Sequence, residues 1–407
     1  MPSSLTWVDH DPAARERSLR ILALFHERES RDELGLGGIR DSFADQLFPG
    51  TSTIQTRLRY MLFVPWIYTR LEKQRVPPEE FAARADRVER ALVTPLLDSD
   101  DQAGVFGRTA GKGLKRLPSS VYWAGLGSWG IRLVDLSQEE YHRQIGTIYR
   151  RRADQDAKDR ERARQGDDRE APPEPGTITW HPRLPEPPPE FPEQVDFALT
   201  SEEANFLLDR LTRRHPQSLL VHLARHCQPA DVDAPWLHPE RAGFREEHQE
   251  LLEHGRRFSE VMHGAALLYN LALTELLRRE EKAAEYRERY NQWAQSLDLT
   301  DLRVWSLSLL WQLTMDKGHT IGPLTRRFVE RWIELVREDP LNLLDHQEVR
   351  NLIRRREETL KGARSRFRNR RALEQWGGAS GLGRLVYRWP TARIFLRDLY
   401  DGTHRGT

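Results

Sequence analysis

The stretch from Gly166 to Pro192 most constrains how this chain of 407 residues can fold, because nine of its residues are proline. Proline has no amide hydrogen and a fixed φ, so neither a helix interior nor a central strand can run through such a stretch. The composition predicts an extended, poorly packed linker. We therefore expect a proline-rich, charged linker at 165–199 that separates two parts of the chain.

On both sides of this linker, apolar residues recur at helical spacing. The ranges 249–281, 302–315 and 324–336 each show this period, and no convincing run of alternating strand residues occurs. We predict an all-α, multi-helical protein with two helical regions joined by the proline-rich linker. The expected parts are an N-terminal helical domain 1–164, the linker 165–199, a central helical domain 200–340 and a basic C-terminal helical region 341–407.

Composition indicates a compartment and excludes some classes of protein. Cys227 is the single cysteine, so no disulfide can form within the chain, which is typical of a reducing cytoplasm. The longest apolar run, 60–68, is far shorter than the roughly 20 residues that a membrane-spanning helix needs. The first residues lack the basic start and apolar run of a signal peptide. We expect a soluble cytoplasmic protein without a membrane partner, and no cofactor motif is evident.

Positive charge gathers near the C-terminal end. Residues 341–407 hold fifteen basic and seven acidic residues, which leaves 48 basic and 55 acidic residues for the rest of the chain. Within this region, 350–371 has ten Arg or Lys against two Glu. Its apolar positions Val349, Ile353 and Leu360 recur at intervals of four or seven, which predicts one amphipathic helix about 33 Å long.

Arginine dominates this stretch, and its guanidinium group suits bidentate contacts with phosphate. A phosphate-facing surface is therefore the favoured interpretation. The alternatives are a helix docked on the acidic remainder of the chain or on an acidic partner protein. The residues that we expect to contact phosphate are Arg354, Arg355, Lys361, Arg364, Arg368 and Arg371.

A glycine-rich basic loop at 107–116 is a second candidate for phosphate binding. Its glycines allow backbone amides to turn towards an anion. It departs from a Walker A loop, because three residues rather than four precede Gly111-Lys112, and Gly113 follows in place of Ser or Thr. A plain basic loop is the equal alternative. The cations that would extend the nucleic-acid footprint are Arg108, Lys112, Lys115 and Arg116.

Residues 39–64 fit a helix-turn-helix pattern with a second helix that begins at Ser52. Its recognition face would present Gln55, Arg57 and Arg59 to DNA bases. The apolar run that follows at once must be buried, so a hairpin of core helices is the favoured interpretation.

Two histidine patterns are weaker candidates for chemistry. His222 and His226 share a helix face at i, i+4 and could ligate zinc, although the Glu of a HExxH protease is missing. Arg257 and His263 resemble the R-x(4–6)-H motif of HEPN-type ribonucleases. That resemblance implies His263 as general base and Arg257 as a phosphate stabiliser. A histidine packed beside Leu267 is the favoured interpretation. The alternative function is thus a metal-independent ribonuclease.

Two blocks carry a further resemblance. DSFADQLFPGTSTIQTR at 41–57 and the segment 107–123 with LPSS and Tyr122-Trp123 resemble an uncharacterised bacterial family, a domain of unknown function. The resemblance covers most of the chain apart from the linker and brings no catalytic residues. It implies an association with anti-phage defence genes, near helicases and phospholipase D-like nucleases, which is an association rather than a mechanism.

These observations predict a non-catalytic nucleic-acid-binding protein, with DNA favoured over RNA. It would serve as a subunit or adaptor of a bacterial defence or DNA-processing assembly, beside a helicase or nuclease. The HEPN-like ribonuclease and a protein–protein scaffold without nucleic-acid contact stay as alternatives.

Overall fold

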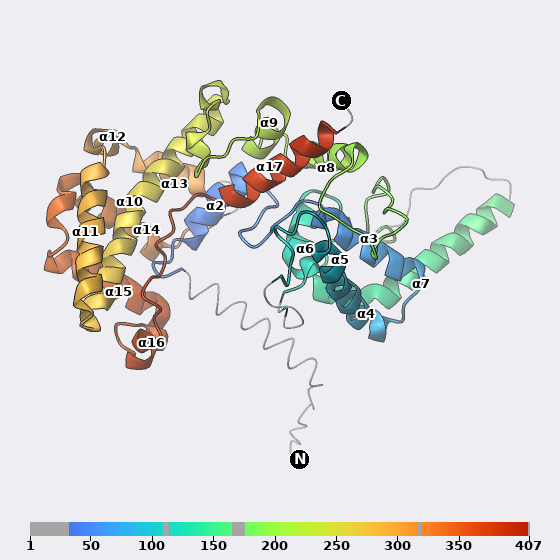
Figure 1. Ribbon diagram of the computed structural model, residues 1–407, viewed down its shortest axis with the longest axis horizontal. Coiled ribbons are helices and arrows are strands. Elements are labelled where there is room, and N and C mark those ends of the chain that lie inside the picture. The colour runs from blue at the N-terminus through green and yellow to red at the C-terminus, as the bar shows by residue number, and fades with distance from the viewer. Residues whose placement is uncertain (1–31, 109–113, 115, 165–175, 316–318, 406–407) are drawn as a thin grey trace, which may run out of the picture. The chain divides into compact units, whose positions relative to one another are not determined.

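The computed structural model describes residues 32–108, 114, 116–164, 176–315 and 319–405. Within these ranges the chain is all-α, with an isolated β-bridge between Arg132 and Trp180 and no β-strand (Figure 1). None of the described helices is both long and apolar enough to cross a membrane. The expected all-α, multi-helical fold is confirmed. A helix expected to follow Asp11-Pro12 lies outside the described residues.

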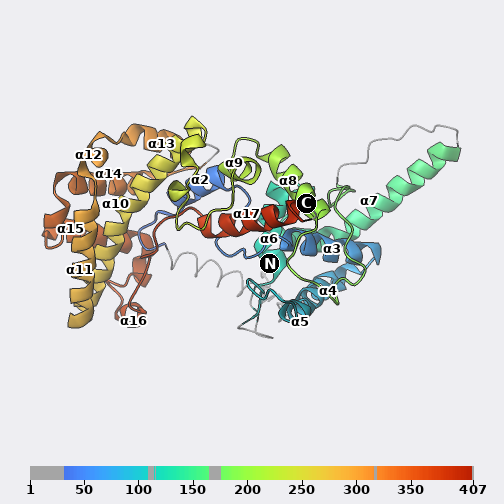
Figure 2. The same cartoon turned by 45° about the horizontal axis from the view of Figure 1, so that its top comes forward.

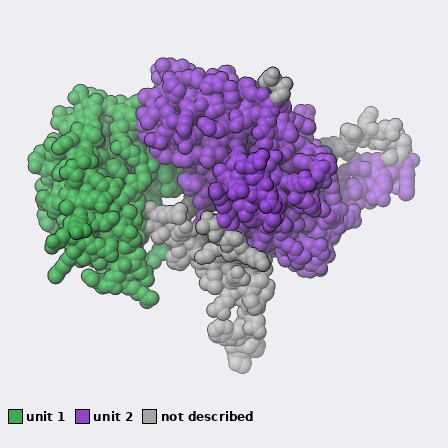
Figure 3. Space-filling view, viewed as in Figure 1, with its two compact units in different colours: residues 1–43, 250–385 green, residues 44–249, 386–407 purple. Residues whose placement is uncertain are grey.

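The chain divides into two compact units, neither of which is continuous in sequence (Figure 3). Unit 1 combines 1–43 with 250–385, and unit 2 combines 44–249 with 386–407. Two helices, α2 (Gly37–Leu47) and α10 (Glu246–Leu276), contain the residues at which the chain passes from one unit to the other.

Unit 1 is built on the long helix α10, which Figure 2 shows from a second direction. Trp293 donates its indole N–H to the Glu260 carbonyl of α10 at 2.8 Å, and Trp332 donates to the Val261 carbonyl at 2.9 Å. Gly264 allows Trp293 to approach, because a Cβ there would lie 2.1 Å from the indole ring. The other α-helices of unit 1 are α11 (Glu280–Ser296), α12 (Leu299–Val304), α13 (Leu307–Met315), α14 (Pro323–Glu338), α15 (Gln347–Lys361) and α16 (Arg370–Glu374).

Unit 2 has α3 (Tyr60–Lys73) at its centre, because almost every side chain of this helix is buried. Pro65 lies inside this helix, which nevertheless continues to Lys73. The other α-helices of unit 2 are α4 (Pro78–Ala91), α5 (Val93–Leu97), α6 (Pro118–Ser128), α7 (Gln138–Arg164), α8 (Ser201–Arg214), α9 (Leu219–His226) and α17 (Trp389–Thr403).

The C-terminal helix α17 packs on α8 within unit 2. Ser201 donates to the Gly402 carbonyl at 3.2 Å, and a Cβ on Gly402 would lie 2.7 Å from that of Ala204. The start of α8 is fixed by a capping box in which Thr200 and Glu203 satisfy each other's backbone amides, as its sequence predicts. Residues 386–407 therefore belong with the middle of the chain rather than with the basic segment that precedes them.

The proline-rich segment differs from the expected linker. Its described part, 176–199, belongs to unit 2 and carries the buried side chains Trp180, Phe191 and Phe197. The Pro185 carbonyl accepts the indole N–H of Trp66 at 2.6 Å. Aromatic residues placed between the prolines thus anchor an extended chain to the unit 2 core, which proline content alone did not predict.

Candidate nucleic-acid interface

The basic segment 350–371 does not form one helix. Helix α15 ends at Lys361, and Gly362 follows with a φ of +51°, a conformation that a helix cannot continue. The buried Glu357 carboxylate then accepts hydrogen bonds from Ser365 Oγ and, at 2.8 Å, from the Arg366 amide. These bonds turn the chain back on itself, so the predicted helix of about 33 Å is wrong.

Four of the ten cations in this segment are held inside unit 1. The Arg366 guanidinium lies 2.8 Å from the buried Glu33 carboxylate, to which Lys361 also donates. Arg356 donates to the Leu34 carbonyl at 2.9 Å, and Arg350 pairs with Glu275. Lys361 was expected to contact phosphate, but its side chain is 11% exposed and serves an internal ion pair.

The other six cations are exposed to solvent. Arg354 and Arg368 share the Glu358 carboxylate at 3.0 and 2.9 Å, and Arg370 pairs with Glu374 at 2.7 Å. Although burial opposes it, hydrogen bonds from Arg368 and Arg354 lower the pKa of Glu358. We call these six residues the arginine surface: Arg354, Arg355, Arg364, Arg368, Arg370 and Arg371.

Two further arginines lie close to the end of this segment in space. Arg278 and Arg279 are exposed at the turn between α10 and α11, and the Arg279 guanidinium lies 5.9 Å from the ring centre of Trp376. The Tyr286 hydroxyl of α11 donates to the Gly378 carbonyl at 2.6 Å, which fixes this neighbourhood. Sequence reasoning missed this pair, because about ninety positions separate it from 370–378 and the acidic Glu280 follows it.

The glycine-rich loop belongs to unit 2 and is described only in part. Arg108 is exposed, and Arg116 is half-buried and has interactions within the structure. Lys112 and Lys115 lie outside the described residues. The predicted contribution of this loop to a phosphate footprint stays a prediction.

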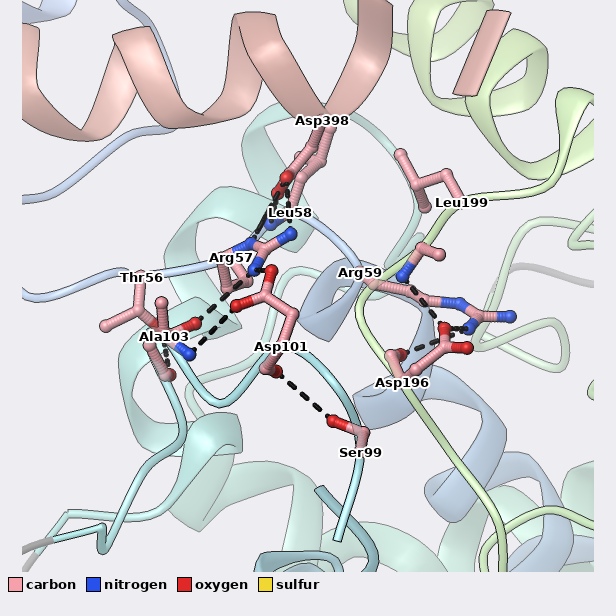
Figure 4. Close-up of polar contacts among 12 residues, drawn as sticks. Thr56, Arg57, Leu58, Arg59, Ser99, Asp101, Ala103, Asp196, Leu199 and Asp398 are labelled. Carbon is pink, nitrogen blue, oxygen red and sulfur yellow. Dashed lines mark hydrogen bonds and ion pairs between the residues drawn. The ribbon is translucent and has the colours of Figure 1, made fainter. Parts of the chain in front are cut away.

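The recognition helix of the less favoured helix-turn-helix alternative does not exist, because α3 begins at Tyr60 rather than at Ser52. Figure 4 shows the polar contacts that the non-helical residues before α3 make. Arg57 lies 2.8 Å from Asp398 of α17 and also pairs with Asp101. Arg59 is buried and lies 2.7 Å from Glu203 of α8. Both arginines serve ion pairs inside unit 2, so the proposed DNA-reading face is wrong.

The histidine pair is close in space. The ring centres of His222 and His226 lie 5.3 Å apart, and His248 lies 5.7 Å from His222. Burial, followed by the neighbouring His248 and His226, lowers the pKa of His222. In the described ranges no group of three or more ligand side chains has an arrangement that could hold a metal ion. In the part of the chain that the structure describes, no third ligand therefore completes a zinc site at His222 and His226.

Arg257 and His263 face different neighbours on α10. Arg257 donates to the Asp301 carboxylate at 3.0 Å, and this bond lowers the pKa of Asp301. His263 is six positions further on, about one and two-thirds turns of the helix. Burial lowers the pKa of His263 to about 4, with Arg384 and Arg289 as the charges that add to this effect. The structure does not bring the two residues of the ribonuclease hypothesis together.

A cavity of about 930 Å³ lies in unit 2 between α3, α7 and residues 177–193. The buried Glu72 carboxylate in its wall accepts the Trp180 indole N–H at 2.8 Å and pairs with Arg152 at 2.6 Å. The remaining charges along the wall come from two cations and two carboxylates, Arg70, Lys73, Glu186 and Glu193. These charges balance, so the net charge of the wall does not indicate a class of ligand.

Comparison with known proteins assigns the family and nothing more specific. The chain belongs to the Family of unknown function (DUF6361), whose model matches residues 2–148 and 175–403. No curated protein and no solved structure matches the chain.

Proposed function

We propose that this protein is a non-catalytic nucleic-acid-binding protein that prefers DNA and holds the phosphate backbone on the arginine surface. The observation that carries the proposal is the division of the ten cations of 350–371. Four are buried or half-buried and make contacts within unit 1, and six are exposed on α15, α16 and the short connection between them.

The ion pairs of the arginine surface do not prevent ligand binding. The side chains of Arg354, Arg368 and Arg370 are 53%, 63% and 70% exposed, even though each has a carboxylate partner. An exposed pair such as Arg370–Glu374 contributes about 0–1 kcal/mol, so a phosphate can replace its carboxylate at little cost. Arg355 and Arg371 have no ion pair with any residue in the described ranges. The positive charge of these exposed guanidinium groups supports attraction of a polyanion.

We further propose a cytoplasmic role as a subunit or adaptor of a bacterial defence or DNA-processing assembly. The support for this step is the resemblance of 41–57 and 107–123 to proteins associated with anti-phage genes. A helicase or a nuclease is the expected partner, and it would supply the catalysis.

The proposal is tested by fluorescence anisotropy with a labelled DNA duplex. Replacement of Arg355, Arg364, Arg368 and Arg371 by alanine should weaken binding at least about tenfold at physiological salt. The matched control replaces four exposed arginines of unit 2 by alanine and so removes the same charge. They are Arg87, Arg143, Arg150 and Arg183. Equal losses in both variants, or no binding by the wild type, would contradict the proposal and favour a protein scaffold.

A further inference from the structure

We infer that the arginine surface binds the backbone of double-stranded nucleic acid and does not distinguish base sequences. This inference rests on the proposed function and names the class of its ligand. It follows from the kinds of side chain that accompany the six arginines and from the secondary structure that carries them.

The first observation concerns aromatic residues. Throughout the described ranges, every Phe, Tyr and Trp side chain is buried or half-buried. Proteins that bind single strands usually stack unpaired bases on exposed aromatic rings, each worth about 1–3 kcal/mol. This chain has 36 aromatic residues, and the described ones lie in or beside the core. A single strand would therefore find cations but no stacking platform on this surface.

The aromatic residues nearest to the arginine surface have neighbours of their own. Phe367 is half-buried, with its ring centre 5.8 Å from that of Tyr269 and the Arg354 guanidinium 6.0 Å away. Trp376 is 3% exposed and has the Arg279 guanidinium beside it. Neither ring presents a free face of the size that a base needs.

The second observation concerns base reading. The amide side chain of Asn369, which lies among these arginines, is already used within the chain. Asn369 caps α16 by accepting from the Ala372 amide at 3.1 Å, and its own amide donates to the Ala363 carbonyl at 3.0 Å. Helix α16 has five residues, too few to present a long polar face to a major groove. The exposed face of α15 carries Arg354 and Arg355, whose guanidinium groups suit phosphate contacts.

This surface offers six exposed guanidinium groups, and a duplex is the nucleic acid that best matches them. Double-stranded DNA carries one phosphate charge per about 1.7 Å of its axis, twice the density of one strand. A protein that binds through charge alone, without stacking on bases or contacting their edges, gains most affinity from a high density of phosphate charge. Arginine can also contact guanine, so the test must include a duplex without guanine.

Direct titrations compare three labelled oligonucleotides of equal length, about two helical turns each. They are a duplex of mixed sequence, a dA·dT duplex and single-stranded oligo(dT). The two duplexes should bind within about twofold of each other, and oligo(dT) should bind at least about tenfold more weakly. Replacement of Phe367 by leucine should leave duplex affinity within about twofold, because the ring contacts the protein rather than the ligand.

Results that differ from these expectations contradict either the inference alone or the proposed function as well. Single-strand binding as tight as duplex binding overturns the inference while the proposed function survives. A preference above about tenfold for the mixed duplex over dA·dT shows base reading and also overturns it. Absence of binding to all three removes the proposed function itself, so the two failures are distinguishable.

Discussion

Whether an arginine of this protein is available to a ligand depends on the carboxylate within its reach. Arg366 and Lys361 share the buried Glu33, so their charges stabilise unit 1. Arg354 and Arg368 share Glu358, whose side chain is 11% exposed, but their own side chains are 53% and 63% exposed. Neighbouring positions of one sequence segment thus have opposite roles, because Glu33 holds its cations in the interior whereas the arginines at Glu358 stay exposed to water.

Replacement of Glu33 by glutamine should destabilise the protein strongly. The change leaves two cations in a buried position without their carboxylate, which costs about 3–5 kcal/mol of unfolding free energy. Glu348→Gln is the control, because that carboxylate is 63% exposed and pairs with Arg331, so its loss should cost about 0–1 kcal/mol. Urea unfolding measures both. Equal effects would show that the Glu33 pairs are not buried in solution.

A second buried acid makes stability depend on pH. Glu89 is 1% exposed and accepts hydrogen bonds from the Ser119 amide and hydroxyl, both at 2.7 Å. Gln138 donates to the same hydroxyl at 2.7 Å and extends the network to α7. Burial raises the pKa of Glu89 to about 7, against the opposing effect of the Ser119 hydrogen bonds.

Because the folded pKa of Glu89 lies above its unfolded value, protonation favours the folded state. This contribution is complete below the unfolded pKa of about 4.3 and is lost as pH rises to about 7. The stability of wild type relative to Glu89→Gln should therefore fall by roughly 3 kcal/mol across that window. Chemical unfolding at several pH values measures it. Parallel stability curves for the two proteins would contradict the assignment.

At the scale of elements, helical periodicity predicted where most helices lie but not where they end. The spacing of Val349, Ile353 and Leu360 is helical, and α15 does carry this face. The end at Lys361 depends on Gly362 and on the bonds that Glu357 makes to Ser365 and Arg366. Glycine was a visible signal for this end, whereas the role of Glu357 becomes apparent only once its burial is known.

The start of α3 shows the same limit. Pro49-Gly50 followed by Thr51 and Ser52 is a good local signal for a helix start, yet α3 begins at Tyr60. The Arg57 guanidinium and the Leu58 amide donate hydrogen bonds to the Asp398 carboxylate, more than three hundred positions away. Such a partner can override local helix propensity, and no local pattern reveals it.

Gly362→Ala tests the end of α15. A Cβ at this position would meet nothing within 4 Å, so the cost comes from the left-handed backbone alone, about 1–2 kcal/mol. Gly377→Ala is the matched control, because its Cβ also meets nothing and its φ is ordinary, so stability should change by less than about 0.5 kcal/mol. Urea unfolding compares them. Equal stability of the two variants would mean that the chain does not turn at Gly362.

At the scale of the whole molecule, the helical spacing of apolar residues predicted the fold class but not the division into units. Each unit joins segments far apart in sequence, so no local change in composition marks it. The proline-rich segment was the obvious boundary, yet its described part packs within unit 2 through Trp180 and Phe191. The excess of positive charge at the C-terminal end coincides with exposed arginines, although six of the ten basic residues of 350–371 are exposed rather than all.

The central claim is that these six arginines hold phosphates, and the salt dependence of duplex binding tests it most directly. With six contacts, a log–log plot of the association constant against salt concentration should have a slope of about −5, and Arg355→Ala with Arg371→Ala should reduce its magnitude by about 2. A shallow slope for the wild type, or the same steep slope in the double variant, would contradict the account.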